Sequence, residues 1–160
     1  MRRLVGWIIV LEVFHAGCLY VGVHTMVNLT PSMPQGFYWR LGRADAVQRG
    51  DLVEMSVPDS VLPYLGELPA SVHLLKQVVG QAGDTVCWQG EGLTVNGRLL
   101  AALPPALTTA EPVGACRVLD QDEVVVLGSH PQSCDSRTLG PMARRRLLYR
   151  VVPLWTWGTP

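Results

Sequence analysis

The stretch Val-His-Leu-Leu-Lys-Gln-Val-Val, residues 72–79, predicts a strand at the centre of a sheet. In an extended chain, successive side chains point to opposite faces. Leu74 and Val78 therefore share one face with Lys76, whereas Leu75 points to the other face. Apolar residues on both faces are typical of a strand that is covered on both sides. This stretch predicts a domain built around a buried β-strand.

Further short strands are predicted on either side of this stretch. Residues 93–95 and 98–100 flank Asn96-Gly97, a pair that supplies the two positive φ angles of a type I′ hairpin turn. The other predicted strands are 37–41, 52–57, 85–88, 123–127 and 147–152. The sequence contains 12 prolines and 16 glycines and shows no long amphipathic helix. The predicted fold is therefore mainly β, with an antiparallel sheet.

The composition limits the classes of partner and cofactor. The chain has 160 residues, with 13 basic and 13 acidic residues, so its charge gives no reason to expect a nucleic-acid partner. Four cysteines occur, none of them in a Cys-x-x-Cys pair, which argues against a structural zinc site. We expect no metal and no cofactor. One disulfide is compatible with an oxidising compartment, and the sequence leaves its pairing open.

The N-terminal run from Leu4 to Val23 is long enough to span a bilayer as a helix. Glu12 opposes insertion by roughly 3 kcal/mol, whereas the eleven Leu, Ile, Val and Phe residues of the run favour it by roughly 3–7 kcal/mol. Arg2 and Arg3 precede the run, and no basic residue follows before Arg40, which predicts a cytoplasmic N-terminus.

These features divide the chain into an anchor, residues 1–23, and a β-rich domain, residues 24–160, outside the cytoplasm. Three other interpretations of the first segment remain open. They are a cleaved signal peptide, a lipoprotein signal ending at Cys18, and a buried core helix. His15 stands where a lipoprotein signal would have Leu, which disfavours the second interpretation.

Lys76 is the residue with the most unusual predicted surroundings. Burial disfavours the ammonium form and lowers the pKa, so a desolvated lysine can act as a general base. Ser32 lies in a loop between Pro31 and Pro34, where its hydroxyl could project into a cleft. Each residue alone has a simpler explanation: a lysine at a sheet edge reaching into water, and an ordinary turn serine.

The combination resembles a known family. Residues 30–38, Thr-Pro-Ser-Met-Pro-Gln-Gly-Phe-Tyr, resemble the nucleophile segment of type I signal peptidases. Within that family, the Pro-x-Gly-x-Tyr after the serine is most similar to the conjugative-transfer branch, the TraF-like peptidases that process pilins. Residues 49–53, 75–84, 95–97 and 133–141 resemble the later conserved segments, in the family's order.

This resemblance implies specific roles for several residues. Ser32 would be the nucleophile and Lys76 its general base. The backbone N–H of Ser32 and the hydroxyl of Thr30 would form the oxyanion hole. Ser133 would orient the Lys76 amine, while Asp135 and Arg137 would pair and support the site.

If the segment 133–137 is extended, Ser133, Asp135 and Arg137 share one face and Cys134 points away, which argues against Cys134 as the nucleophile. One departure from the family pattern is Gly128-Ser129-His130, which replaces the usual Gly-Asp-Asn. This change concerns local packing more than activity.

The resemblance implies a membrane-anchored serine endopeptidase of a bacterial inner membrane that cleaves exported precursors after small residues. The TraF-like features imply a pilin subunit of a conjugation or type IV secretion system as substrate. The expected partners are this membrane-inserted precursor and the lipid bilayer, which Trp155 and Trp157 would suit. Alternatives are a general signal peptidase with many clients, a self-cleaving LexA-like regulator, and a non-catalytic scaffold of a secretion complex. A Ser-His-Asp site using His130 or His24 with Asp45 has no supporting spacing.

Overall fold

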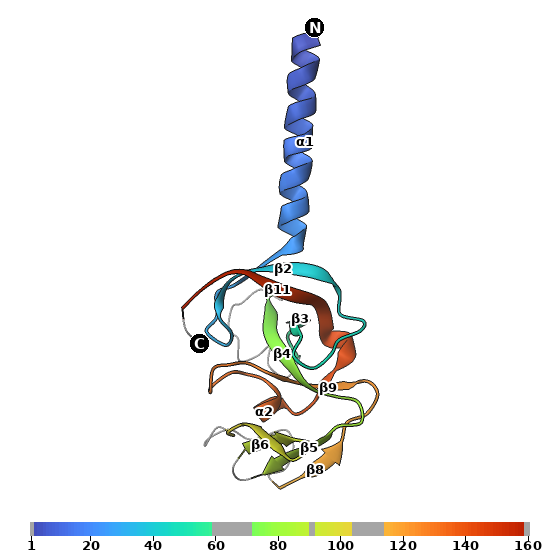
Figure 1. The fold of residues 1–160 in the computed structure, drawn as a ribbon, viewed down its shortest axis with the longest axis vertical. Helices are drawn as coiled ribbons and strands as arrows, with labels where there is room; N and C mark the ends of the chain where they lie inside the picture. The colour runs from blue at the N-terminus through green and yellow to red at the C-terminus, as the bar shows by residue number, and fades with distance from the viewer. Residues whose placement is uncertain (1, 59–71, 90–91, 104–113, 159–160) are drawn as a thin grey trace.

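A computed structural model describes residues 2–58, 72–89, 92–103 and 114–158. The first element, α1 (Arg2–His24), projects away from the rest of the chain as a single helix (Figure 1). Val5–His24 is long and apolar enough to cross a membrane, and none of it is buried against the protein. Apart from Tyr20 and His24, whose rings contact Trp39, the described side chains of this helix are exposed, as expected for a helix that is surrounded by lipid.

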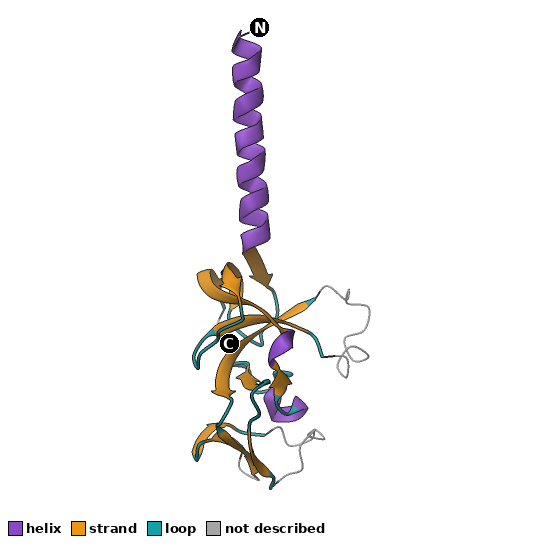
Figure 2. Cartoon of the chain, turned by 90° about the vertical axis from the view of Figure 1, so that its right-hand side faces the viewer, coloured by secondary structure: helices purple, strands orange, loops and turns teal. Residues whose placement is uncertain are grey.

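The remainder is mainly antiparallel β structure, as the sequence predicts. A seven-stranded sheet has the order β1 (Thr25–Asn28), β2 (Gln35–Arg43), β11 (Leu147–Trp157), β3 (Leu52–Ser56), β4 (His73–Gln81), β9 (Glu123–Leu127), β10 (Met142–Ala143). A smaller sheet has the order β7 (Arg98–Ala101), β6 (Gly92–Val95), β5 (Thr85–Gln89), β8 (Cys116–Val118). The small sheet lies at the end farthest from α1 (Figures 1 and 2). Two short helices complete the described part, α2 (Ser136–Leu139) and a 3₁₀ turn at Arg144–Arg146.

Strand β4 lies inside the larger sheet and is covered on both faces. It pairs with β3 on one side and β9 on the other. Leu75 packs in a cluster with Met26 and Tyr38, whereas Val78 packs in a different cluster with Val53. The prediction of a strand buried on both faces is confirmed.

The eight strands predicted from periodicity and turn residues are all present, with ends that differ by a few residues. Strand β1 is not among the predicted strands. Its sequence Thr-Met-Val-Asn has no strong pattern, and its conformation depends on pairing with β2, where Val27 lies opposite Phe37. The segment 133–137 does not meet the condition of an extended conformation, because it bends and enters α2. Asp135 caps that helix through its side chain, a local hydrogen bond that competes with strand geometry.

A disulfide joins two neighbouring strands of the smaller sheet, β5 and β8. Cys87 on β5 lies directly opposite Cys116 on β8, and the two sulfurs are bonded. This resolves the pairing that the sequence left open, and Cys18 and Cys134 are free. The bond closes a loop with a sequence separation of 29 residues. A cross-link of this size limits the unfolded chain and stabilises the fold.

Replacing both Cys87 and Cys116 by Ser should lower the free energy of unfolding by about 3–4 kcal/mol, the value that chain entropy gives for a loop of this length. Urea unfolding of the detergent-solubilised chain, followed by tryptophan fluorescence, measures the change. Cys18→Ser is the matched control, since that thiol is free and exposed on α1. An unchanged unfolding midpoint in the double variant would contradict the prediction.

Candidate active site

Ser32 lies in the tight loop between β1 and β2, and a buried asparagine organises this loop. The side-chain amide of Asn28 donates to the carbonyl oxygens of Thr30 at 3.0 Å, Met33 at 3.0 Å and Pro34 at 3.1 Å. Asn28 is only 4% exposed, so these bonds form away from water. Sequence reasoning missed Asn28, because its role depends on a loop conformation that carries no pattern of its own.

The hydroxyl groups of Thr30 and Ser32 are hydrogen-bonded to each other. Their oxygens lie 3.1 Å apart, and Thr30 Oγ1 also lies 2.9 Å from Asn28 Oδ1. The amide oxygen can only accept, so Thr30 donates its proton to Asn28 and the Ser32 hydroxyl donates to Thr30. The structure therefore places together the two residues that the resemblance assigns to the nucleophile and the oxyanion hole.

Lys76 extends from β4 into the protein interior and is 1% exposed. Burial lowers the pKa of its amine to about 8. Electrostatic interactions with Asp135 and Cys134 act in the opposite direction and raise the pKa of Lys76, whereas the charge of Arg137 lowers it further. At pH 7 the neutral fraction is roughly 300-fold larger than for a lysine with an ordinary pKa of 10.5. An amine in this state can accept a proton near neutral pH.

The turn from Gly128 to Arg137 is held by a buried ion pair. The carboxylate of Asp135 and the guanidinium of Arg137 approach to 2.6 Å and are both almost completely buried. Asp135 also accepts from the backbone N–H of Gly128 at 2.8 Å. Arg137 donates to the carbonyl oxygens of Gly128, His130 and Pro131. These bonds fix the backbone of the turn at both ends.

This turn lies against the Ser32 loop. Ser129 Oγ and the backbone N–H of His130 both donate to the Ser32 carbonyl oxygen, each at 3.4 Å. A Cβ atom at Gly128 would lie 2.5 Å from that oxygen and 2.2 Å from Ser133 Oγ, so only glycine fits there. Ser133 Oγ is buried without a hydrogen-bond partner, and it is the only such side-chain atom among the described residues. A buried hydroxyl without a partner remains available for a further hydrogen bond.

Ser32 and Lys76 therefore both lie near the turn from Gly128 to Arg137. Ser32 contacts its backbone, and Lys76 interacts electrostatically with Cys134, Asp135 and Arg137. Within the described part of the chain, the Ser32 hydroxyl is bonded to Thr30 and not to Lys76. Catalytic hydrogen bonds are often long or absent before substrate binds.

Cys134 does not point away from Lys76, as the extended conformation had implied. The Lys76 charge acts on its thiol, although burial is the larger effect and raises the pKa of Cys134. A raised pKa disfavours the reactive thiolate. Cys134 is therefore a poor nucleophile for a reason that differs from the one expected.

The histidines outside this site have other contacts. His24 stacks on Trp39, with ring centroids 5.3 Å apart, and His130 Nδ1 accepts from the backbone N–H of Gln132. Asp45 lies near Arg43. These side chains are not hydrogen-bonded to Ser32 in the described structure.

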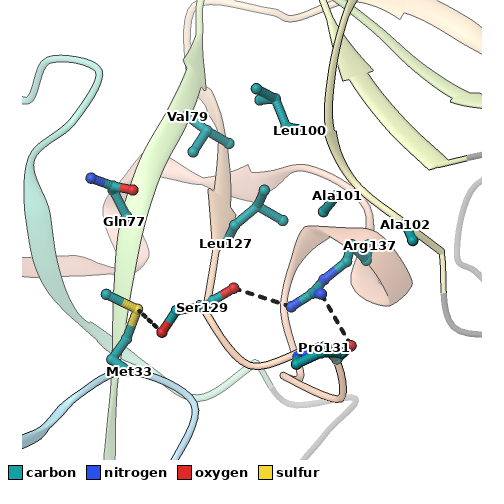
Figure 3. A pocket seen from close by; sticks show the side chains of 11 residues that line it. Met33, Gln77, Val79, Leu100, Ala101, Ala102, Leu127, Ser129, Pro131 and Arg137 are labelled. Carbon is teal, nitrogen blue, oxygen red and sulfur yellow. Dashed lines mark hydrogen bonds between the residues drawn. The ribbon is translucent and has the colours of Figure 1, made fainter. Parts of the chain in front are cut away.

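A cleft of about 450 Å³ opens beside the Ser32 loop (Figure 3). Its walls come from the nucleophile loop, the turn after β9, the strands β4 and β9, and the small sheet; they include Met33, Gln77, Val79, Leu100, Ala101, Ala102, Leu127, Ser129 and Arg137. Apolar walls with a few polar groups are typical of a binding cleft.

Comparison with known proteins agrees with this geometry. The family profile described as "Signal peptidase, peptidase S26" matches residues 3–156. The chain is also 29% identical to "Plasmid transfer protein TraF" from Escherichia coli, over 89% of this chain and 88% of that protein. Since the profile covers nearly all of the sequence, the chain belongs to the signal peptidase family, peptidase S26.

Proposed function

We propose that the protein is a membrane-anchored serine endopeptidase in which Ser32 is the nucleophile and Lys76 the general base. The observation that carries this proposal is the buried Lys76 amine, whose pKa is lowered to about 8, beside a turn that contacts Ser32. Membership of the family supports a serine peptidase that processes exported precursors. Because Ser32 and Lys76 lie within the matched segment, the family and the geometry support the same residues.

In the proposed mechanism, the Ser32 hydroxyl breaks its hydrogen bond to Thr30 when substrate enters and forms one to Lys76 instead. Ser32 Oγ attacks the scissile carbonyl carbon while neutral Lys76 takes its proton. The Thr30 hydroxyl and the Ser32 backbone N–H donate to the oxyanion. The ammonium of Lys76 then gives its proton to the leaving amine, and water hydrolyses the acyl-enzyme by the reverse sequence of proton transfers.

Ser133, Asp135 and Arg137 support this reaction without touching the substrate. The unpartnered Ser133 hydroxyl would orient the Lys76 amine. Arg137 neutralises Asp135, which would otherwise favour the ammonium form of Lys76. The ion pair thereby keeps the general base available near neutral pH.

The proposed substrate is a pilin subunit of a conjugation or type IV secretion system, cut after small residues. The similarity to a plasmid transfer protein favours this over a general signal peptidase with many clients. A non-catalytic scaffold is disfavoured, because a buried lysine that serves no chemistry would only destabilise the fold.

The proposed location is a bacterial inner membrane, with the N-terminus cytoplasmic and residues 24–160 in the periplasm. The Cys87–Cys116 disulfide supports an oxidising compartment for the domain. Exposed aromatic rings of Phe37, Trp155 and Trp157 lie within 5.4–6.3 Å of one another on β2 and β11, the strands nearest α1 (Figure 1). Such a cluster suits contact with the bilayer surface.

Lys76→Met should abolish precursor processing and also stabilise the protein at neutral pH. The lysine pKa falls from 10.5 to about 8 on folding, so burying the ammonium costs about 3 kcal/mol below pH 8. This cost disappears between pH 8 and 10.5, where the folded protein releases the proton first. Ser32→Ala should abolish processing without this stability gain, and the double variant should be no less active than either single one. Processing above a few per cent of the wild-type rate in either single variant would contradict the dyad.

The pH dependence of kcat/KM tests the base directly. The rate should rise with pH to a plateau with a midpoint near pH 8, because only the neutral amine of Lys76 accepts a proton. Arg137→Gln should move the midpoint to higher pH, since Asp135 then favours the ammonium form. Arg137→Lys keeps the positive charge and is the matched control. A flat profile from pH 5 to 9, or a midpoint that Arg137→Gln leaves in place, would overturn the assignment.

Reporter fusions after Pro160 test the topology. Alkaline phosphatase, which needs the periplasm, should be active there, because Arg2 and Arg3 hold the N-terminus in the cytoplasm. Activity of a cytoplasm-dependent reporter at this position instead would show that the orientation is inverted.

A further inference from the structure

A second cavity, of about 380 Å³, is lined by Thr30 and by residues that precede it in the chain. The strand β1 and its following loop form one wall, and Arg40 on β2, Glu54 on β3 and His73 on β4 contribute the charged and polar groups. A catalytic cleft that takes only small side chains would need no such groups. The cavity lies outside the proposed dyad and its supporting residues.

The three polar side chains form a connected cluster around a buried carboxylate. Glu54 accepts from Arg40 Nε at 2.6 Å, Arg40 Nη2 at 2.7 Å and His73 Nδ1 at 2.6 Å. Burial raises the pKa of Glu54, but the hydrogen bonds from Arg40 and His73 outweigh it and hold the pKa below its ordinary value. Glu54 is therefore a carboxylate, and its charge is balanced by Arg40.

The exposure of the three side chains decides which chemistry the cavity presents. The side chain of Glu54 is 1% exposed, whereas those of Arg40 and His73 are 20% and 32% exposed. A guanidinium has five N–H donors, and the described bonds of Arg40 use three: two to Glu54 and one to the Val23 carbonyl oxygen. A ligand in the cavity therefore meets unused donor groups of Arg40 and the ring of His73, with the carboxylate behind them.

The cavity adjoins the position where a substrate would react. Thr30 lines it, and Thr30 Oγ1 is 3.1 Å from Ser32 Oγ. An extended peptide advances about 3.3 Å per residue, so a side chain in this cavity belongs to a residue within about three positions of the scissile bond.

We infer that the Arg40–Glu54–His73 cavity is a specificity subsite for a substrate side chain that carries a hydrogen-bond acceptor oxygen, such as Asn or Asp. This inference rests on the proposed peptidase function. Arg40 and Glu54 also brace the end of α1 through Val23, so His73 is the member whose contribution to recognition can be separated from the fold. A site built to hydrogen-bond a substrate group rejects analogues without it, because its own polar groups are then left unpaired.

The experiment uses the full chain in detergent micelles and a set of synthetic peptides. The parent peptide has Ala at both positions flanking the cut. The six positions around the cut are varied one at a time among Ala, Leu, Lys, Asn and Asp. At one position, Asn or Asp should raise kcat/KM at least tenfold over Leu and Lys. His73→Leu should reduce this ratio to about one. Gln81→Leu, at the other end of the same strand, should leave both the ratio and the activity unchanged.

Glu54→Gln provides an independent test, because the preference for Asp over Asn would not change if the role of Glu54 were purely structural. Removing the buried negative charge leaves Arg40 unbalanced, so the preference for Asp over Asn should increase severalfold at the same position. One of the two variants, His73→Leu or Glu54→Gln, could have a lowered thermal unfolding midpoint. The other variant then tests the subsite, and so does the peptide preference of the wild-type enzyme.

The possible failures are distinguishable. A wild-type enzyme that cleaves peptides with no preference for Asn or Asp at any position overturns the subsite and leaves the peptidase intact. An equal loss of activity on every peptide in His73→Leu, with the ratio unchanged, shows that the cluster is structural and also overturns it. Absence of all cleavage, or cleavage that survives in Ser32→Ala, overturns the proposed function and the subsite with it.

Discussion

The Lys76 side chain is almost entirely removed from water, and the surrounding structure is arranged so that its amine stays there without a carboxylate partner. An ammonium ion in a protein interior ordinarily either pairs with an acid or loses its proton. Strand β4 holds Lys76 between β3 and β9, so the side chain cannot reach solvent by bending away from an edge. A lowered pKa is the response that remains, and burial is its largest cause.

Asp135 alone would raise the pKa of Lys76, and Arg137 counteracts this effect. A free carboxylate near the amine would stabilise the ammonium and raise the pKa again. Arg137 engages both oxygens of Asp135, at 2.9 and 2.6 Å, and adds a positive charge that disfavours protonation of Lys76. The same guanidinium also binds three carbonyl oxygens of the turn that touches Ser32. One ion pair therefore affects both the charge of the Lys76 amine and the position of the turn beside Ser32.

The sequence predicts the parts of this structure whose signal is local and periodic. The strands β4 and β9, the Asn96-Gly97 hairpin and the apolar helix were all predicted, because alternation, turn chemistry and length are properties of short segments. Lys76 stood out for the same reason, as a charge within an apolar strand. Its burial follows from two neighbouring strands that are distant in sequence, and the structure was needed to show it.

Features that arise only from tertiary contacts were not predicted. The pairing of Cys87 with Cys116 depends on β8, a three-residue strand with no pattern of its own. In the sequence, nothing distinguishes Asn28 from other polar residues. Its hydrogen bonds to the loop are visible only in the structure. Glu54 interrupts an apolar strand much as Lys76 does, but its partner Arg40 belongs to another strand, so the cluster was not visible in the sequence. The family resemblance supplied roles for Thr30, Ser133 and Asp135 that the residues alone did not.

The connection between the anchor and the nucleophile loop is short and braced, which has a consequence for the kind of substrate that can be cut. Strand β1 begins at Thr25, directly after α1 ends at His24, and Thr25 Oγ1 donates to the Val21 carbonyl oxygen at 2.7 Å. Arg40 ties the end of α1 to Glu54 inside the domain. The four residues of β1 span only about 13 Å at the usual rise of a strand. A helix fixed in a bilayer would therefore hold the Ser32 loop close to the membrane surface, with little freedom to reach farther. This geometry favours peptide bonds that lie just outside the bilayer, as in the membrane-inserted precursors proposed here, over bonds in soluble proteins.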